Sequence, residues 1–179
     1  GEANPDFTLQ AYGLRNEDTG DVGNSAFFQV FANEYTGVGQ YTLSLLGATA
    51  QNYNLTFGSS FLNITPRNLT ITAKDAVREY GDQNPFFTAD FDGLASFDDA
   101  SVISNLVFTT TATQGSIAQN YGINANYDLN SNYNISFEPG TLTVTKAPLT
   151  INLSDVSRIY GDGNGNALSG VKIESAYGF

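Results

Sequence analysis

Apolar and polar residues alternate with a period of two along several short segments of the chain. The alternating apolar positions are Leu69, Ile71 and Ala73; Tyr121, Ile123, Ala125 and Tyr127; Tyr133, Ile135 and Phe137; and Leu142 and Val144. Such a pattern places one face of a strand on a core and the other in water. Residues 86–92 and 105–113 are predicted to be further strands, and no segment has the pattern of a helix. Gly, Asn, Asp and Pro separate the segments, which favours an all-β fold of antiparallel, sandwich-type sheets.

The chain repeats itself at a spacing of 80 residues. Residues 1–80 align with residues 81–160 without a gap, and 24 of the 80 pairs are identical. The identical pairs include Asn52-Tyr53-Asn54 with Asn132-Tyr133-Asn134, Leu69-Thr70-Ile71 with Leu149-Thr150-Ile151, and Asp75, Arg78 and Tyr80 with Asp155, Arg158 and Tyr160. A fixed period of this kind indicates a tandem array of one structural unit.

The phase of the repeat predicts three parts. Residues 1–66 form a first module that lacks its opening strand, residues 67–147 form a complete second module, and residues 148–179 begin a third. Pro66 and Pro148 mark the boundaries, because proline has no N–H to donate to a ladder. The sheet of the first module is expected to have an unpaired edge or to borrow a strand. A chain that starts and stops within a repeat is expected to be a window from a longer array.

The most distinctive motif follows the first strand of the complete module. It consists of Tyr80, Gly81, Asp82, Asn84 and Pro85, and it recurs as Tyr160, Gly161, Asp162 and Asn164, with Gly165 in the place of the proline. Glycine adopts a positive φ, Asp bonds to nearby backbone N–H groups, and proline fixes φ, so the motif predicts a turn with φ > 0 at Gly81. A ligand-binding loop is the alternative.

A resemblance to a known family rests on this motif and on two later ones. These are Asn132-Tyr133-Asn134-Ile135-Ser136-Phe137 and Gly140-Thr141-Leu142-Thr143-Val144-Thr145-Lys146-Ala147. Together the motifs resemble those of MBG modules, mostly bacterial Ig-like repeats of large secreted adhesins and filamentous-haemagglutinin-like exoproteins. The chain departs from the family at Ser59-Ser60-Phe61, where the family has Gly-Thr. The resemblance implies a stalk or adhesin role at the cell surface, in cell adhesion and biofilm, and supplies no catalytic residues.

Composition narrows the chemistry further. The chain has no Cys and no His, which excludes disulfides, thiolate or imidazole metal sites, and catalytic groups built on either residue. The 18 acidic and 7 basic residues give a net charge of −11, which repels nucleic acid and anionic lipid. No apolar run approaches the ~20 residues of a membrane-spanning helix, and Gly1 to Asp6 do not resemble a signal peptide. We therefore predict no nucleic-acid partner, no membrane insertion of this segment, and no cofactor.

Carboxylates are the remaining candidates for chemistry. They cluster as Glu17, Asp18 and Asp21; Asp90 and Asp92; and Asp98 and Asp99, and only Asp18 and Asp98 align at the repeat spacing. Calcium prefers six to eight oxygen ligands, but no EF-hand or glycine-rich calcium repeat is present, so solvated loops are favoured. Asp90 and Asp92 share one strand face, yet their repeat partners Gln10 and Tyr12 are uncharged, which disfavours a glycosidase pair.

Two covalent modifications are also considered and disfavoured. Asn-x-Ser/Thr triplets occur at Asn54, Asn63, Asn68, Asn134 and Asn152, where strands rich in Thr and Asn produce them by accident. An isopeptide bond from Lys74 or Lys146 is unsupported, since these lysines align with Ser154 and Pro66.

The sequence therefore predicts a non-enzymatic stalk or spacer of an extracellular bacterial adhesin, with neighbouring repeats of the same chain as its partners. The alternative is a module that itself binds an extracellular polysaccharide or a host or surface protein. Inward-facing aromatic side chains would favour the stalk, and an exposed row of them would favour binding. A hydrolase is a distant third hypothesis.

Overall fold

The chain is described by a computed structural model that covers residues 1–15, 25–152, 155 and 157–161. It falls into two compact units, residues 1–147 and residues 148–179. The described residues contain ten strands and a single 3₁₀ turn, η1 (Ala100–Val102), and no α-helix. The predicted all-β fold class is confirmed.

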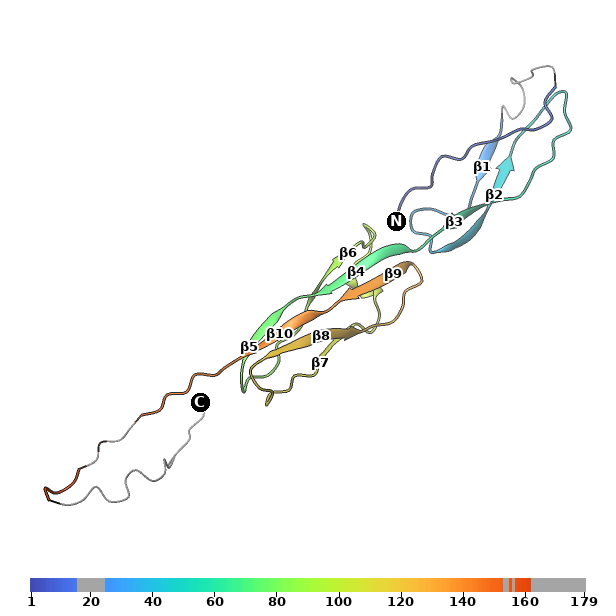
Figure 1. Cartoon of the computed structure of the whole chain (residues 1–179). Helices are drawn as coiled ribbons and strands as arrows, with labels where there is room; N and C mark the ends of the chain where they lie inside the picture. Colours follow the sequence, from blue (N-terminus) through green and yellow to red (C-terminus); the bar gives the residue numbers. More distant parts are fainter. Residues whose placement is uncertain (16–24, 153–154, 156, 162–179) are drawn as a thin grey trace. The chain divides into compact units, whose positions relative to one another are not determined.

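Residues 67–147, the predicted second module, form two sheets that pack on each other. One contains β6 (Ala89–Asp92), β4 (Arg67–Ala73) and β9 (Tyr133–Glu138), in that order (Figure 1). The other contains β5 (Ala76–Glu79), β10 (Gly140–Thr145), β8 (Asn120–Asn126) and β7 (Val107–Thr110). The opening strand β4 lies at the centre of its sheet, so both neighbours depend on it for their hydrogen bonds.

The sequence pattern predicted antiparallel sheets, but both sheets of the second module are mixed. β4 pairs with β9 in parallel, and β5 pairs with β10 in parallel, whereas the other pairs are antiparallel. The reason is that β4 and β5 are separated only by Lys74 and Asp75, and β9 and β10 only by Pro139. Each is one long segment that passes from one sheet into the other, and the two segments run side by side.

Two of the predicted strands are shorter than expected. Residues 86–92 contain β6 only from Ala89, after the turn motif and Pro85, and residues 105–113 contain β7 only from Val107 to Thr110. Asn105 has a φ of 54° and its side chain donates to Asp128 at 2.7 Å, so the chain bends there before the strand begins. A positive φ is incompatible with an extended strand.

The core of the second module consists of two clusters between the sheets. One contains Leu69, Ile71, Ala95, Ile103 and Tyr133, and the other contains Ala73, Ala112, Ile123, Leu142 and Val144. Leu69, Ile71, Ile123 and Leu142 are fully buried. Burial of each such side chain stabilises the fold by about 1.5–3 kcal/mol.

Residues 1–66, the predicted first module, form one sheet. It contains β1 (Phe27–Gln29), β2 (Gly39–Leu46) and β3 (Ser60–Ile64), which align in the repeat with β7, β8 and β10. Residues 9–12 and 53–58 align with β6 and β9, but they form no strand. No residue of the described stretches 1–15 and 25–66 is buried. We predicted an unpaired edge or a borrowed strand, whereas the described residues 1–15 and 25–66 contain one sheet only.

The second unit is described only in part. Among its described residues, 148–152, 155 and 157–161, none is in a strand and all are exposed. Leu149 and Ile151 are 84% and 77% exposed, although their repeat partners Leu69 and Ile71 are fully buried. Tyr160 and Gly161 lie in a turn, and Gly161 has a φ of 95°. Asp162, Asn164 and Gly165 lie outside the described residues.

Candidate functional site

The turn motif follows β5 directly. Gly81 has a φ of 96°, the positive value predicted for it. The N–H of Asp82 donates to the carbonyl of Glu79 at 3.3 Å, and the N–H of Tyr80 donates to the carbonyl of Thr145 at 2.9 Å. The motif therefore ends β5 beside the end of β10.

Arg78 and Asn84 hold this turn against the loop that follows β7. The guanidinium of Arg78 donates to the Asn84 side-chain oxygen at 2.7 Å and to the carbonyl of Thr113. The amide of Asn84 donates to the carbonyl of Ala112, also at 2.7 Å. Arg78 is only 6% exposed, and sequence reasoning did not single it out as an anchor. The sequence signal for its structural role was its recurrence as Arg158 at the repeat spacing.

The same asparagine contact exists in the first module. The amide of Asn4, the repeat partner of Asn84, donates to the carbonyl of Ala32 at 2.7 Å, and Ala32 is the partner of Ala112. The asparagine of the motif is thus used in both copies to connect two backbone segments. Pro85 follows it at an exposed position.

Tyr133 anchors the opposite end of the second module. Its hydroxyl accepts a hydrogen bond from the N–H of Ala95 at 3.0 Å and donates to the carboxylate of Asp98. Burial, and then the hydrogen bond to Asp98, raise the pKa of Tyr133 above its usual range. The hydroxyl of Tyr53, its repeat partner, accepts from the N–H of Arg15 at the same distance, 3.0 Å. The recurrent Tyr therefore closes the same loop in each module.

Asn132 connects the second module to the first. Its side-chain oxygen accepts the N–H of Val38 at 2.9 Å and lies about 3.0 Å from where a Cβ on Gly37 would be. Two further contacts cross the same junction. The rings of Tyr35 and Phe97 lie 4.8 Å apart between centroids, and Arg67 lies 3.4 Å from Glu2.

The predicted motif residues do not gather at one place. Residues 67–79 and 133–145 run parallel, so both segments begin at one end of the module and end at the other. The Tyr80–Pro85 turn follows their ends, whereas Asn132 lies beside their beginnings. These are opposite ends of the module. The end of the first module that aligns with the turn supplies Gly1 and Glu2 to the junction with the second module.

Three of the carboxylates singled out from the sequence, Asp90, Asp98 and Asp99, bond to protein groups. Asp90 lies 2.7 Å from the Lys74 ammonium, and Asp98 accepts from Tyr133. Asp99 caps η1, and the hydrogen bonds from Ser101 lower the pKa of its carboxyl. Among the described residues no group of three or more Asp or Glu could hold a metal ion. Glu17, Asp18 and Asp21 lie outside the described residues.

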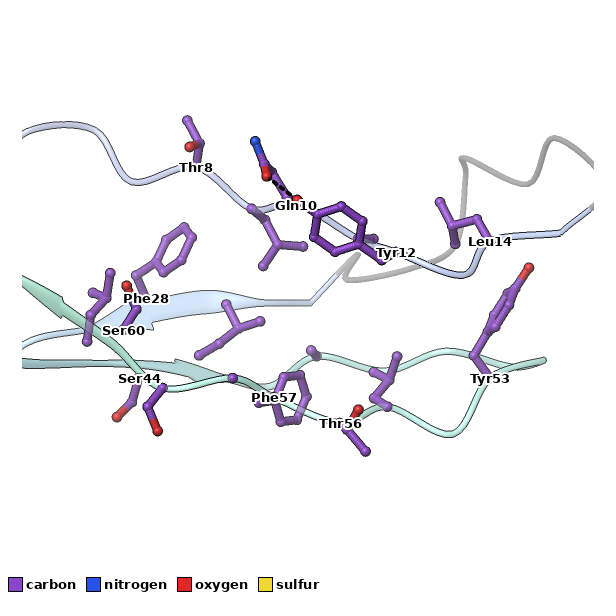
Figure 2. A pocket seen from close by; sticks show the side chains of 18 of the residues that line it. Thr8, Gln10, Tyr12, Leu14, Phe28, Ser44, Tyr53, Thr56, Phe57 and Ser60 are labelled. Carbon is purple, nitrogen blue, oxygen red and sulfur yellow. Dashed lines mark hydrogen bonds between the residues drawn. The ribbon is translucent and has the colours of Figure 1, made fainter.

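The first module contains a groove of about 750 Å³. Figure 2 shows Thr8, Gln10, Tyr12 and Leu14 along one side, and Tyr53, Thr56, Phe57 and Ser60 along the other. Phe28, Leu43 and Leu45 form its floor on the β-sheet. The groove thus lies between the two segments that align with β6 and β9. Sequence reasoning did not identify it.

The comparisons with known proteins give one family. The family model of the MBG domain (YGX type) matches residues 1–63 and residues 69–143. No curated protein and no solved structure matches the chain. Within the described part of the chain, no helix is long and apolar enough to cross a membrane.

Proposed function

Because the chain belongs to the MBG domain (YGX type) family, a family of structural repeat domains, we propose that it is a spacer segment of a bacterial cell-surface protein. In this role it lies outside the cell and holds a distal adhesive region away from the surface. Its partners are the neighbouring repeats of the same chain.

The junction between the two modules is the observation that carries the proposal. Only Thr65 and Pro66 separate β3 from β4, so the linker has little slack. The hydrogen bond from Val38 to Asn132 and the ring contact between Tyr35 and Phe97 connect the modules directly. A spacer needs such contacts, because freely jointed modules would collapse into a coil.

The composition supports the same role. Without cysteine, each unit folds without oxidation in any compartment. A net charge of −11 keeps closely spaced copies soluble by mutual repulsion. Most aromatic residues of the second module, such as Phe91, Tyr127 and Phe137, pack on its core clusters.

A distance measurement across the junction tests the proposal. The chain has no cysteine, so spin labels can be attached only at the introduced Thr42→Cys and Thr109→Cys, which are exposed positions in β2 and β7. We expect one narrow distance distribution by pulsed electron resonance. Asn132→Ala combined with Tyr35→Ala should broaden it, and four Gly-Ser residues inserted before Pro66 serve as the flexible control. A wild-type distribution as broad as that of the control would overturn the spacer role.

A binding module is the second candidate, and one observation favours it. Phe86 is 101% exposed and Tyr80 is 50% exposed, both beside the turn motif. Exposed aromatic side chains are used to stack on ligands. Binding to an array of polysaccharides or matrix proteins that is lost in Phe86→Ala, and kept in Leu129→Ala, would favour this function over the spacer.

A further inference from the structure

The edge strands of the second module differ in charge. β5 and β7 are the edges of one sheet, and β6 and β9 are the edges of the other. β5, β6 and β9 each carry charged side chains, such as Glu79, Asp90 and Glu138. β7, with the sequence Val-Phe-Thr-Thr, carries none. Charged side chains on an edge strand keep other strands from pairing with it, so β7 alone among these described edges lacks that protection.

The lack of charge extends beyond β7 itself. Residues 101–127, which include β7 and β8, contain no Asp, Glu, Lys or Arg, although the whole chain has 18 acidic and 7 basic residues. The exposed side chains nearest the edge are Val107 and Thr109, with Asn124 and Asn126 opposite them in β8. A chain with a net charge of −11 repels its own copies. Two copies can therefore approach each other most closely at this uncharged edge.

β7 is held extended without a partner on its outer side. Among the described strands it pairs only with β8, through all four of its residues, and Phe108 packs on a core cluster. Before the strand, the side chain of Asn105 donates to Asp128 at 2.7 Å. After it, the side chain of Asn84 donates to the carbonyl of Ala112, also at 2.7 Å. A strand fixed in this way loses little conformational entropy when another strand pairs with its outward backbone groups.

The uncharged edge recurs in the first module. β1, which aligns with β7, also lies at the edge of its sheet and carries no charge. Phe27 and Val107 occupy the same position of the repeat and are exposed to a similar extent, 57% and 56%. An exposed apolar side chain on an uncharged edge is thus a property of the repeat and not of one module.

We propose that β7 is a self-association edge, which pairs in antiparallel orientation with β7 of a second copy of this chain. The two four-stranded sheets then form one continuous sheet across both copies. The orientation follows from charge, because the Asp128 carboxylate lies beside the start of β7. Antiparallel pairing places the two copies of Asp128 at opposite ends of the new pair, whereas parallel pairing would bring these like charges together. The spacer role does not depend on this association.

The alternation of β7 limits the register. Directly opposed residues lie on the same face of a sheet, so Val107 can oppose Thr109 but not Thr110. With Phe108 of each copy at the centre, Val107 of one copy lies opposite Thr109 of the other on the outer face. The two half-buried Phe108 side chains then lie beside each other on the inner face, where an aromatic pair stabilises adjacent strands.

Cross-linking tests this register. The chain has no cysteine, so full-length Val107→Cys and full-length Thr109→Cys, with different tags, each introduce a single thiol. They should form a mixed disulfide on mild oxidation, because opposed residues of antiparallel strands lie about 4.5–5.5 Å apart between Cα atoms. Asn124→Cys, the exposed neighbour of Thr109 in β8, is the control in place of Thr109→Cys. Mixed dimers at no more than the control level would overturn the proposal.

Sedimentation tests the association without cysteines. The full chain should form dimers reversibly as its concentration rises to about 1 mM, and added salt should strengthen them by screening the net repulsion. A wild type that stays monomeric throughout, which is the result expected if the edge instead pairs with a peptide of another protein, would overturn the proposal.

A charge placed on the edge separates edge pairing from general repulsion. Thr109→Lys lowers the net negative charge of the chain, yet it should raise the dissociation constant about tenfold because the lysine lies within the strand pair. Asn124→Lys changes the net charge equally, away from the edge, and should not weaken the association. Both positions are exposed, so both variants should keep the wild-type melting point. A Thr109→Lys variant that associates as strongly as the wild type would overturn the proposal.

Discussion

The first and second modules share motifs, spacing and many contacts, but only the second has a core. Asn4 and Asn84 make the same bond to the aligned Ala32 and Ala112. Tyr41 and Tyr121 each donate to the aligned carbonyl of Gly37 or Ile117, at 2.9 and 3.0 Å. The buried hydrophobic residues nevertheless all lie between Leu69 and Val144 in the described part of the chain. Shared local contacts do not by themselves produce a core.

The described residues of the two modules differ in their second sheet. β4 contributes two fully buried side chains, Leu69 and Ile71, which corresponds to about 3–6 kcal/mol. Typical domains are stable by only about 5–15 kcal/mol. β4 is also the centre of its sheet, because β6 and β9 both pair with it. In the first module, the described segments aligned with β6 and β9 form no strand.

Expression of the two modules as separate fragments should give the largest difference in folding stability. We expect residues 67–148 alone to unfold cooperatively with a β-type circular dichroism spectrum, because they contain both sheets and both core clusters. Residues 1–66 alone should show no cooperative transition, since none of their described residues is buried. Adding residues 66–80 in front of Gly1 of that fragment should restore one.

The opposite outcome would move the module boundary. If residues 67–148 aggregate or remain unfolded, and a stable fold returns when the fragment starts at Gly81, then the opening strand belongs to the preceding module. The predicted boundaries at residues 66 and 147 remain a prediction until this is measured.

Aligned substitutions in the equivalent strands β2 and β8 should give the next largest effect. Ile123 in β8 is fully buried, and Leu43 at the aligned position in β2 is partly exposed on the floor of the groove. Ile123→Ala in the full chain should cost about 2–5 kcal/mol in denaturant unfolding, because it creates a cavity in a closed core. Leu43→Ala should cost less than about 1 kcal/mol. Equal losses would mean that the first module is closed in solution.

Substitution of two aligned glycines should distinguish the cost of backbone strain from the cost of steric overlap. Gly93→Ala and Gly13→Ala both place a side chain at a positive φ, which costs about 1–3 kcal/mol. Only the first also forces a Cβ against the carbonyl of Asn68. We expect Gly93→Ala to destabilise the protein by about 1–3 kcal/mol more than Gly13→Ala. Equal losses for the two variants would show that the overlap with the carbonyl of Asn68 adds nothing to the backbone strain.

Much of the fold could be predicted, because its signals are local. The alternation around Leu69, Ile123 and Leu142 indicated strands that the structure contains, and the glycine of the turn motif required the positive φ that Gly81 has. The family resemblance rested on the same motifs, and the match over both repeats confirms it. The parallel pairs were not predicted, since a parallel and an antiparallel neighbour impose the same alternation on a strand.

The sites were harder to predict, because they depend on contacts between residues that are far apart in the chain. Asp98 was weighed as a calcium ligand, but its carboxylate accepts the hydroxyl of Tyr133, a contact between residues far apart in the chain. Arg78 is buried among backbone carbonyls, which no local pattern shows. The groove lies between residues 8–14 and 53–60, which are far apart in the chain, so only the structure shows it.

Metal removal should have the smallest effect, and should leave both modules unchanged. A calcium site needs six to eight oxygen ligands, yet the described carboxylates Asp90, Asp98 and Asp99 bond to Lys74, Tyr133 and Ser101. Thermal unfolding in excess EDTA and in millimolar calcium should therefore give melting points within a few degrees of each other. A ligand that binds only the native state raises the melting point in proportion to its affinity. A calcium-dependent rise above about 10 °C would thus establish a tight site. Repeating the measurement on residues 67–148 would then assign that site to one module or the other.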